Sequence, residues 1–210
     1  MLSIALLLLV GLVVAQQPRP CTSPSQWEAR IISHINNENI TVQGKLSYDS
    51  VYQRERFIEQ VVIGDDYYYE TIALFQVRLE FVINLTARNC SRLPLTRPWR
   101  DFSIRSDAHS YGEAYIGSSA SPSTGLLITL WGGNYTTPSN DTVNYIGTWT
   151  YEACLPVSHT SIHPKYGITH DSFYDVSGGI SDPNVFIPPR ECLSDKEYAI
   201  RHTLFGASPK

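Results

Sequence analysis

The chain has 210 residues, of which 42% are hydrophobic and 17% charged, and its formal net charge is -4. This length and composition suit one domain with a core of ordinary size. The small negative charge and the scattered arginines exclude the basic patch typical of nucleic-acid binding, and no polybasic membrane patch is present.

The first fifteen residues predict a secretory signal peptide that is cleaved after Ala15. The apolar run Ile4–Val14 ends in the small-residue pattern typical of a cleavage site. This run is shorter than the ~20 residues that a membrane span needs, so no transmembrane anchor is expected. We therefore expect a secreted chain with one mature domain over residues 16–210.

Strand patterns dominate the first half of the mature chain. A strand is expected from Trp27 to Ile35, and the turn-forming composition of Asn36–Asn39 ends it. The next expected elements are a hairpin of 45–49 with 54–59, a turn at 64–66 and a strand that opens at 67–69.

The clearest periodicity lies in Phe75–Leu85. Apolar residues alternate with polar ones through this segment, so it predicts one half-buried antiparallel strand with every apolar side chain on the same face. Asn84, which is a glycosylation sequon, falls on the polar face.

The second half of the chain continues this pattern. An extended loop is expected over 90–99, and strands are expected over 111–117 and 126–131. In 142–154 the alternation places Val143, Tyr145, Trp149 and Tyr151 on one face, and this strand is expected to continue past Cys154 toward His163.

The stretch Phe173–Cys192 has strand composition up to a glycine pair, then a turn at Asp182-Pro183 and an extended segment at Pro188-Pro189. Behind it, Ser194–Glu197 is a capping box and predicts a short terminal helix over Tyr198–Thr203. Together these elements predict an antiparallel all-β domain with one small helix.

The four cysteines predict two disulfides in a secreted chain, and their wide spacing excludes a CxxC metal knuckle. Three pairings are possible from the sequence alone. Five sequons indicate a glycoprotein. The cysteines are Cys21, Cys90, Cys154 and Cys192, and the sequons are Asn39, Asn84, Asn89, Asn134 and Asn140.

No motif for catalysis is present in the sequence. A Gly-x-Ser-x-Gly elbow, a phosphate-binding glycine loop and an HExxH motif are all absent, so we expect no enzyme. His159 and His163 could share a strand face as a metal or proton-sensitive site, although solvated histidines explain them more simply. The best oxygen donors for calcium are Asp65, Asp66, Asp171 and Asp175, without EF-hand spacing.

Five separated motifs resemble the ependymin and ependymin-related proteins. They are Pro-Cys-x-x-Pro-x-Gln-Trp-Glu from Pro20, Leu-Ser-Tyr-Asp at 46–49, Cys-Ser-x-x-x-Leu-Thr-x-Pro-Trp at 90–99, Ile-Gly with Cys-Leu-Pro-Val within 146–157, and Phe-x-Asp-Val-x-x-Gly-Ile-x-Asp-Pro-x-Val-Phe-x-Pro-Pro at 173–189. The resemblance covers nearly the whole mature chain.

This resemblance implies a fold and a disulfide pairing. The fold would be a curved β-sandwich of two antiparallel sheets, similar to bacterial lipoprotein carriers, with a hydrophobic pocket. Cys21 would pair with Cys154, and Cys90 with Cys192. The family also implies a homodimer, a secreted or lysosomal location, calcium as a cofactor, and binding of anionic lipids or gangliosides.

Inward-facing side chains are the candidates for lining such a pocket, although core packing is the simpler explanation for each. The candidates are Phe75, Val77, Leu79, Phe81, Tyr145, Trp149 and Tyr151. The first hypothesis is thus a non-enzymatic protein that binds a hydrophobic ligand. The alternative is a calcium-dependent adhesion glycoprotein of the extracellular matrix that has no ligand pocket.

Overall fold

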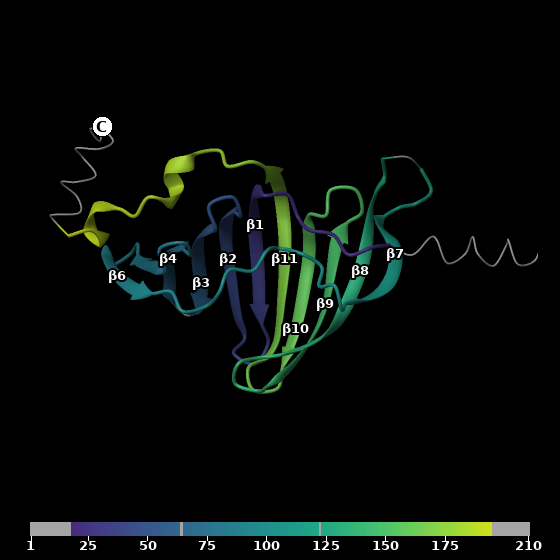
Figure 1. The fold of residues 1–210 in the computed structure, drawn as a ribbon, viewed down its shortest axis with the longest axis horizontal. Coiled ribbons are helices and arrows are strands. Elements are labelled where there is room, and N and C mark those ends of the chain that lie inside the picture. Colours follow the sequence, from purple (N-terminus) through teal and green to yellow (C-terminus); the bar gives the residue numbers. More distant parts are fainter. Residues whose placement is uncertain (1–17, 64, 122, 195–210) are drawn as a thin grey trace, which may run out of the picture. The chain divides into compact units, whose positions relative to one another are not determined.

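The computed structural model describes residues 18–63, 65–121 and 123–194 (Figure 1). The chain forms two compact units, each assembled from separated segments. The first unit contains the described residues up to Ser23 together with Phe102–Ile168, and the second contains Pro24–Asp101 and the residues from Thr169 onward. The predicted signal peptide and the predicted helix Tyr198–Thr203 lie outside the described residues.

The second unit is an antiparallel sheet with the strand order β6-β5-β4-β3-β2-β1-β11. Its strands are β1 (Gln26–Ile35), β2 (Ile40–Asp49), β3 (Arg54–Ile63), β4 (Asp65–Leu74), β5 (Leu79–Asn84), β6 (Asn89–Pro94) and β11 (Gly167–Gly178), the last of which belongs to this unit from Thr169. The predicted strand 27–35 and the predicted hairpin are confirmed.

One face of this sheet, here called the Trp27 face, is aromatic. Trp27 pairs with Tyr48 across β1 and β2, and their ring centroids are 5.1 Å apart. Trp99, from the segment after β6, stacks on Tyr48 at 5.3 Å and meets Phe75 edge-on at 4.9 Å. An irregular segment thus covers this end of the face and completes its core.

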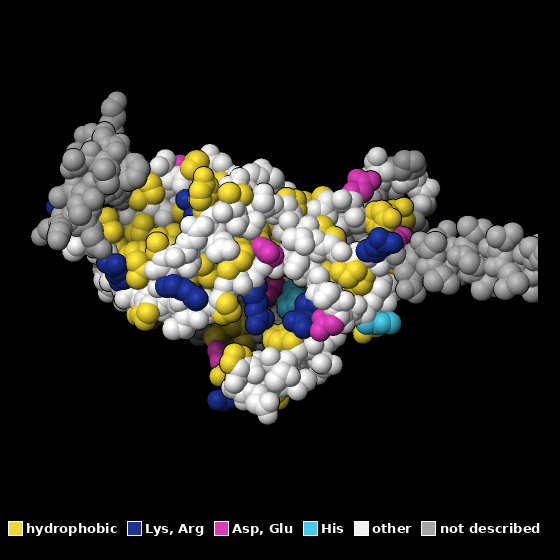
Figure 2. Space-filling model, in the orientation of Figure 1, with side chains coloured by type: hydrophobic (Ala, Val, Ile, Leu, Met, Phe, Trp, Pro, Cys, Tyr) yellow, Lys and Arg dark blue, Asp and Glu magenta, His cyan; other side chains and the backbone are white. Residues whose placement is uncertain are grey.

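The opposite face, here called the Glu28 face, lies under the C-terminal segment. After β11 this segment forms the short 3-10 turns Pro183–Phe186 and Arg190–Cys192 (yellow-green in Figure 1). Cys192 packs on a cluster of Ile72, Phe81 and Ile83. The sheet of the second unit is therefore covered on both faces by extended chain, and Figure 2 shows apolar and basic side chains mixed on its surface at the left of the view.

The first unit is an antiparallel sheet with the order β10-β9-β8-β7. Its strands are β7 (His109–Gly117), β8 (Gly125–Thr136), β9 (Thr142–Thr150) and β10 (Pro156–His163). Thr22 bridges to Ser103, and the amide of Ile104 donates to the carbonyl of Cys21, so the two extended segments of this unit run together. The predicted all-β, antiparallel fold is confirmed; its arrangement as two stacked sheets stays a prediction.

The prediction of one strand over Phe75–Leu85 is wrong in its first four residues. A turn occupies 75–78 between β4 and β5, and Arg78 there has φ +56°. Phe75 therefore packs with Ala73 and Leu95, whereas Phe81 packs on the Glu28 face, and Val77 is exposed. The alternation continues through a turn that contains no glycine, proline or asparagine, so the sequence pattern does not reveal it.

Two further boundaries differ from the predictions. The expected loop over 90–99 begins as strand β6, which pairs with β5. The expected strand over 142–154 ends at Thr150, because Cys154 adopts a φ of +52° and its amide donates to the carbonyl of Thr150. The chain then turns into β10, a separate strand, and Tyr151 is exposed in the turn.

Candidate functional site

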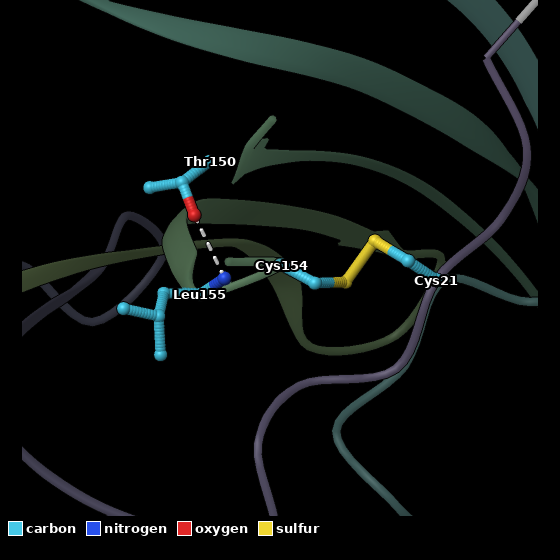
Figure 3. Close-up of a disulfide and its surroundings, with 4 residues drawn as sticks. All are labelled: Cys21, Thr150, Cys154 and Leu155. Carbon is cyan, nitrogen blue, oxygen red and sulfur yellow. Dashed lines mark hydrogen bonds between the residues drawn. A yellow bond between two sulfur atoms is a disulfide. The ribbon is translucent and has the colours of Figure 1, made fainter. Parts of the chain in front are cut away.

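Two disulfides are formed, one inside each unit. Cys21 joins Cys154 in the first unit, and Cys90 joins Cys192 in the second. This is the pairing that the family resemblance implies. Figure 3 shows the first disulfide beside the turn after β9, where the hydroxyl of Thr150 accepts a 2.9 Å hydrogen bond from the amide of Leu155.

Aromatic side chains gather on one face of the paired strands β8 and β9 in the first unit, here called the β8–β9 face. Three successive cross-strand pairs build it: Thr129 opposite Trp149, Trp131 opposite Gly147, and Gly133 opposite Tyr145. Residues two apart on a strand share a face, so these six positions are neighbours.

Glycines allow the rings to lie flat along this face. A Cβ atom at Gly147 would collide with the six-membered ring of Trp149, and one at Gly133 would lie 3.4 Å from the Tyr145 hydroxyl. The indole of Trp149 therefore lies over Gly147, next to Trp131, and the ring of Tyr145 lies over Gly133. Any larger residue at Gly147 would displace the indole.

Four buried polar side-chain atoms of the described residues have no hydrogen-bond partner, and all four lie on this face. They are Thr129 Oγ1, Trp131 Nε1, Tyr145 Oη and Trp149 Nε1. Thr129, Trp131 and Trp149 are 5%, 2% and 7% exposed. Buried polar groups are normally paired, so four unpaired groups in adjacent positions mark this face as a candidate site.

The cover of the β8–β9 face comes from the segment before β7. Ile104 and Ala108 pack on the two tryptophans together with the Cys21–Cys154 disulfide. Beside them, the Arg105 guanidinium makes two hydrogen bonds to Asp107, of 2.9 and 2.8 Å, and lies 5.9 Å from the Tyr135 ring centroid.

Electrostatics at this face favour neutral groups. Burial raises the pKa of Tyr145, and the positive charge of Arg105 offsets only part of that rise, so Tyr145 is a neutral hydroxyl at physiological pH. Arg105 is largely neutralised by Asp107, whose pKa the same hydrogen bonds lower. His159 stacks on Tyr145 at 6.0 Å between centroids.

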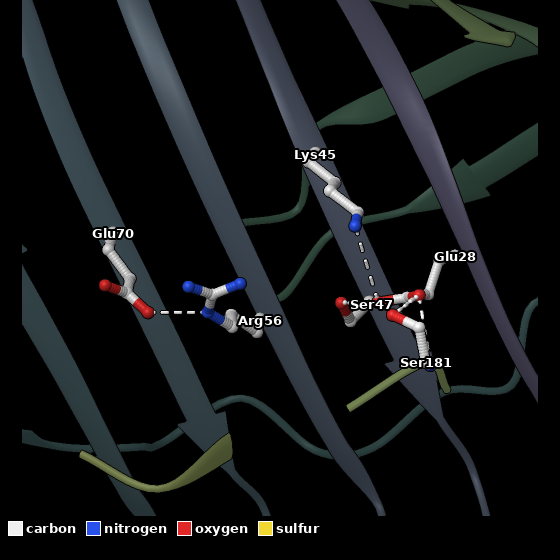
Figure 4. A network of polar contacts seen from close by, with 6 residues as sticks. All are labelled: Glu28, Lys45, Ser47, Arg56, Glu70 and Ser181. Carbon is white, nitrogen blue, oxygen red and sulfur yellow. Dashed lines mark hydrogen bonds and ion pairs between the residues drawn. The ribbon is translucent and has the colours of Figure 1, made fainter. Parts of the chain in front are cut away.

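In the second unit, Glu28 is the centre of a buried polar network (Figure 4). Its carboxylate accepts hydrogen bonds from the hydroxyls of Ser47 at 2.8 Å and Ser181 at 2.5 Å and from the Ser181 amide, with Lys45 3.9 Å away. Burial alone would raise the pKa of Glu28, but these hydrogen bonds and Lys45 together hold it below its usual value. The network joins the C-terminal segment to β1 and β2.

Two other carboxyl groups, both on β3, behave in the opposite way. Burial raises the pKa of Glu55, and Arg97, 3.3 Å away, opposes the rise. Burial also raises the pKa of Glu59, and no charged group among the described residues opposes that rise. Both side chains lie on the Trp27 face of the sheet, one on each side of Phe57.

The predicted pocket residues are divided between the units. Phe75, Leu79 and Phe81 belong to the clusters of the second unit, whereas Tyr145 and Trp149 share the β8–β9 face of the first. Val77 and Tyr151 are 59% and 49% exposed in turns. Thr129, Trp131 and Glu28 are not among the residues that the sequence predicts for a site. The signal that could have found the first two is the run Trp131-Gly132-Gly133, which pairs with Tyr145-x-Gly147.

Two of the four predicted calcium donors, Asp171 and Asp175, already make contacts within the chain. Asp171 accepts a hydrogen bond from Ser33, and Asp175 pairs with Arg30 at 2.6 Å, so a cation at Asp175 would have to displace the guanidinium. The side chains of Asp65 and Asp66 lie outside the described atoms. Within the part of the chain that the structure describes, no group of three or more His, Cys, Asp or Glu side chains could hold a metal ion.

The two histidines of the predicted site both lie on β10 and make different contacts. His159 contacts Tyr145, while Nδ1 of His163 accepts hydrogen bonds from the backbone amides of Lys165 and Tyr166.

Most predicted sequons are accessible. Asn39, Asn89, Asn134 and Asn140 are exposed. Asn84 is half-buried at the end of β5, and its amide group contacts the Tyr69 hydroxyl and the backbone amide of Ala87.

Comparison with known proteins gives a family. The Ependymin family matches residues 64–192. Mammalian ependymin-related protein 1 of Rattus norvegicus is 30% identical over 83% of this chain and 77% of its own, and the ependymin of Notemigonus crysoleucas is 26% identical over 89% and 86%. An uncharacterized conserved protein from Thermus thermophilus aligns with a TM-score of 0.49 at 8% identity, over 90% of this chain and 96% of its own. No helix among the described residues has the length and apolarity to cross a membrane. The match over 64–192 and these relatives place the chain in the ependymin family.

Proposed function

We propose that this protein is a secreted, non-enzymatic glycoprotein that binds a hydrophobic ligand with a polar group, such as an anionic lipid or ganglioside. The observation that carries the proposal is the β8–β9 face, which combines the apolar rings of Trp131, Trp149 and Tyr145 with polar atoms that have no partner among the described residues. A purely apolar core would leave no polar atoms unpaired, and a purely polar site would not be lined with indoles.

Secretion and glycosylation are supported by the covalent chemistry. Disulfides form in oxidising compartments, and four of the five sequon asparagines are exposed, as attachment of a glycan requires. A lysosomal location, a homodimer and bound calcium remain proposals that follow from the family resemblance.

The test is to express the protein in a secretory host, extract it with organic solvent, and identify co-purified lipid by mass spectrometry. We expect bound lipid in the wild-type protein and a several-fold decrease in Tyr145→Leu, because the ring over Gly133 is lost. The matched control is Tyr115→Leu, since Tyr115 is 51% exposed on β7.

Absence of lipid, together with a melting temperature that anionic vesicles do not change, would contradict the proposal. Calcium-dependent binding to matrix proteins that is lost on enzymatic deglycosylation would instead favour the adhesion function.

A further inference from the structure

The four unpaired atoms of the β8–β9 face also define the chemistry of the group that binds them. All four can donate a hydrogen bond: two are indole N–H groups, and two are hydroxyls. The indole N–H groups are donors only, so a group that offers only donors, such as an ammonium, cannot pair with them. The bound group must therefore present several acceptor oxygens.

The charge of that group follows from its surroundings. Thr129, Trp131 and Trp149 are neutral, and the raised pKa of Tyr145 keeps it neutral as well. Arg105, which lies by the Tyr135 ring, is already bound to Asp107 by two hydrogen bonds. An ionised oxygen buried here would lose its hydration without gaining a full counter-charge, whereas a neutral carbonyl oxygen needs only the hydrogen bonds that the site offers.

The spacing matches a group with more than one carbonyl. The four residues come from three successive cross-strand pairs, so their backbone positions extend along the strands over four residues, about 13–14 Å in total. A carbonyl oxygen has two lone pairs and cannot reach donors at both ends of such a row, so a second carbonyl is needed for the others.

We infer that the β8–β9 face recognises the neutral carbonyl linkages of an acyl lipid, its ester or amide groups, while the charged head group remains in water. This inference rests on the proposed function and adds to it a preference for one type of linkage in the lipid. The site prefers acyl-linked over ether-linked chains, whatever head group they carry. Because the four atoms are shielded from water, the ligand must part the side chains over this face, including Ile104 and Ala108, which pack on the two tryptophans.

The experiment compares two probes that differ only in the linkage. Vesicles of dipalmitoyl phosphatidylglycerol, a diester, and of dihexadecyl phosphatidylglycerol, its diether, are titrated against delipidated protein, and bound lipid is measured after separation. We expect about tenfold tighter binding of the diester, which is ~1.4 kcal/mol.

The decisive variant is Thr129→Val, which removes one hydroxyl and keeps the shape of the side chain. It should reduce the preference for the diester to about threefold or less and should leave the melting temperature of the ligand-free protein unchanged or raised, because an unpaired buried hydroxyl is removed. Thr148→Val is the control, since Thr148 lies on the opposite face of β9 and should change neither quantity. Tyr145→Phe tests a second hydroxyl in the same way.

A readout without substitutions uses the four tryptophans of the chain. In a nitrogen-15 correlation spectrum, the indole N–H signals of Trp131 and Trp149 should move downfield with the diester and not with the diether. The Trp99 signal should remain in place, because its indole N–H already donates to Asp101 at 2.9 Å.

The outcomes separate the two proposals. Equal binding of both lipids, with unmoved indole signals and an unaffected Thr129→Val, would overturn the carbonyl inference and leave lipid binding intact. Binding of neither lipid would overturn the proposed function and the inference with it.

Discussion

The hydroxyl of Ser181 donates a 2.5 Å hydrogen bond to the carboxylate of Glu28, which lies 153 positions earlier in the sequence. Glu28 is 4% exposed, and Ser47 on the neighbouring strand donates to its other oxygen. This contact closes the C-terminal segment over the Glu28 face near its start, and the Cys90–Cys192 disulfide fixes the segment near its end. One carboxylate thus links the first strand of the second unit to the segment that follows its last strand.

Replacing Glu28 by alanine should therefore lower the free energy of unfolding by about 2–3 kcal/mol, because the buried Ser47 hydroxyl would lose its acceptor and the C-terminal segment would lose its Ser181 hydrogen bonds. Urea unfolding at pH 7 measures the loss. Glu28→Gln should lower the free energy of unfolding by less, since an amide oxygen can still accept one of these hydrogen bonds.

Asp175→Asn is the matched control. The Arg30–Asp175 pair is as short as 2.6 Å, but both side chains are more than two-thirds exposed, and such surface pairs contribute about 0–1 kcal/mol. Equal losses in Glu28→Ala and Asp175→Asn would show that the Glu28 network does not hold the segment.

The ionisation of Glu28 should raise the free energy of unfolding as the pH rises, whereas the ionisation of Glu59 should lower it. The pKa of Glu28 is lowered from 4.5 in the folded state, so its contribution is present above pH 4.5 and is lost as the pH falls through the lowered pKa. The pKa of Glu59 is raised from 4.5, so ionising it destabilises the fold as the pH rises through the raised value.

Glu59→Gln should consequently raise the melting temperature at pH 7 and have little effect below pH 4, whereas Glu28→Gln should lower it at pH 7 and lose its effect in acid. Thermal unfolding of both variants between pH 3 and pH 7 checks this. A Glu59→Gln variant less stable than wild type at pH 7 would contradict the argument that Glu59 is a buried charge that no opposite charge offsets.

Trp99 should be a main contributor to the core of the Trp27 face. Its ring contacts both Tyr48 and Phe75, and its N–H donates to Asp101. Trp99→Ala should lower the free energy of unfolding, measured in urea, by about 3–5 kcal/mol. Trp99→Phe should lower it clearly less, because the two ring contacts remain. A loss below about 1 kcal/mol in Trp99→Ala would show that the segment after β6 does not belong to the core.

The Trp99 contacts also show what the sequence could and could not predict. The strand Trp27–Ile35 and the hairpin of 45–49 with 54–59 follow from local composition and turn residues, and the structure confirms both. The segment around Trp99 has no period, so nothing local indicates that it returns to Tyr48, much earlier in the chain. That contact is decided by tertiary packing.

The same limit applies to the candidate site. Alternation placed Tyr145 and Trp149 on one face correctly, but it grouped them with Phe75 and Phe81, which lie in the other unit. The turn at 75–78 reverses the chain without a turn-forming composition, so periodicity alone assigns Phe75 and Phe81 to one face. Only the cross-strand register brings Thr129 opposite Trp149.

Each disulfide should protect mainly its own unit. Replacing Cys21 and Cys154 by alanine opens a link between residues 133 positions apart, and loss of a native disulfide typically costs about 2–5 kcal/mol. We expect faster amide hydrogen exchange in β8 and β9, because Ile104 and Trp149 pack on this disulfide. Exchange in β2 to β5 should change little.

The double variant of Cys90 and Cys192 should have the opposite pattern, with faster exchange in β5 and β6, since Cys192 covers Phe81 and Ile83. Hydrogen exchange followed by mass spectrometry resolves these strands, and uniform acceleration through the whole chain in either variant would contradict the assignment of each disulfide to one unit.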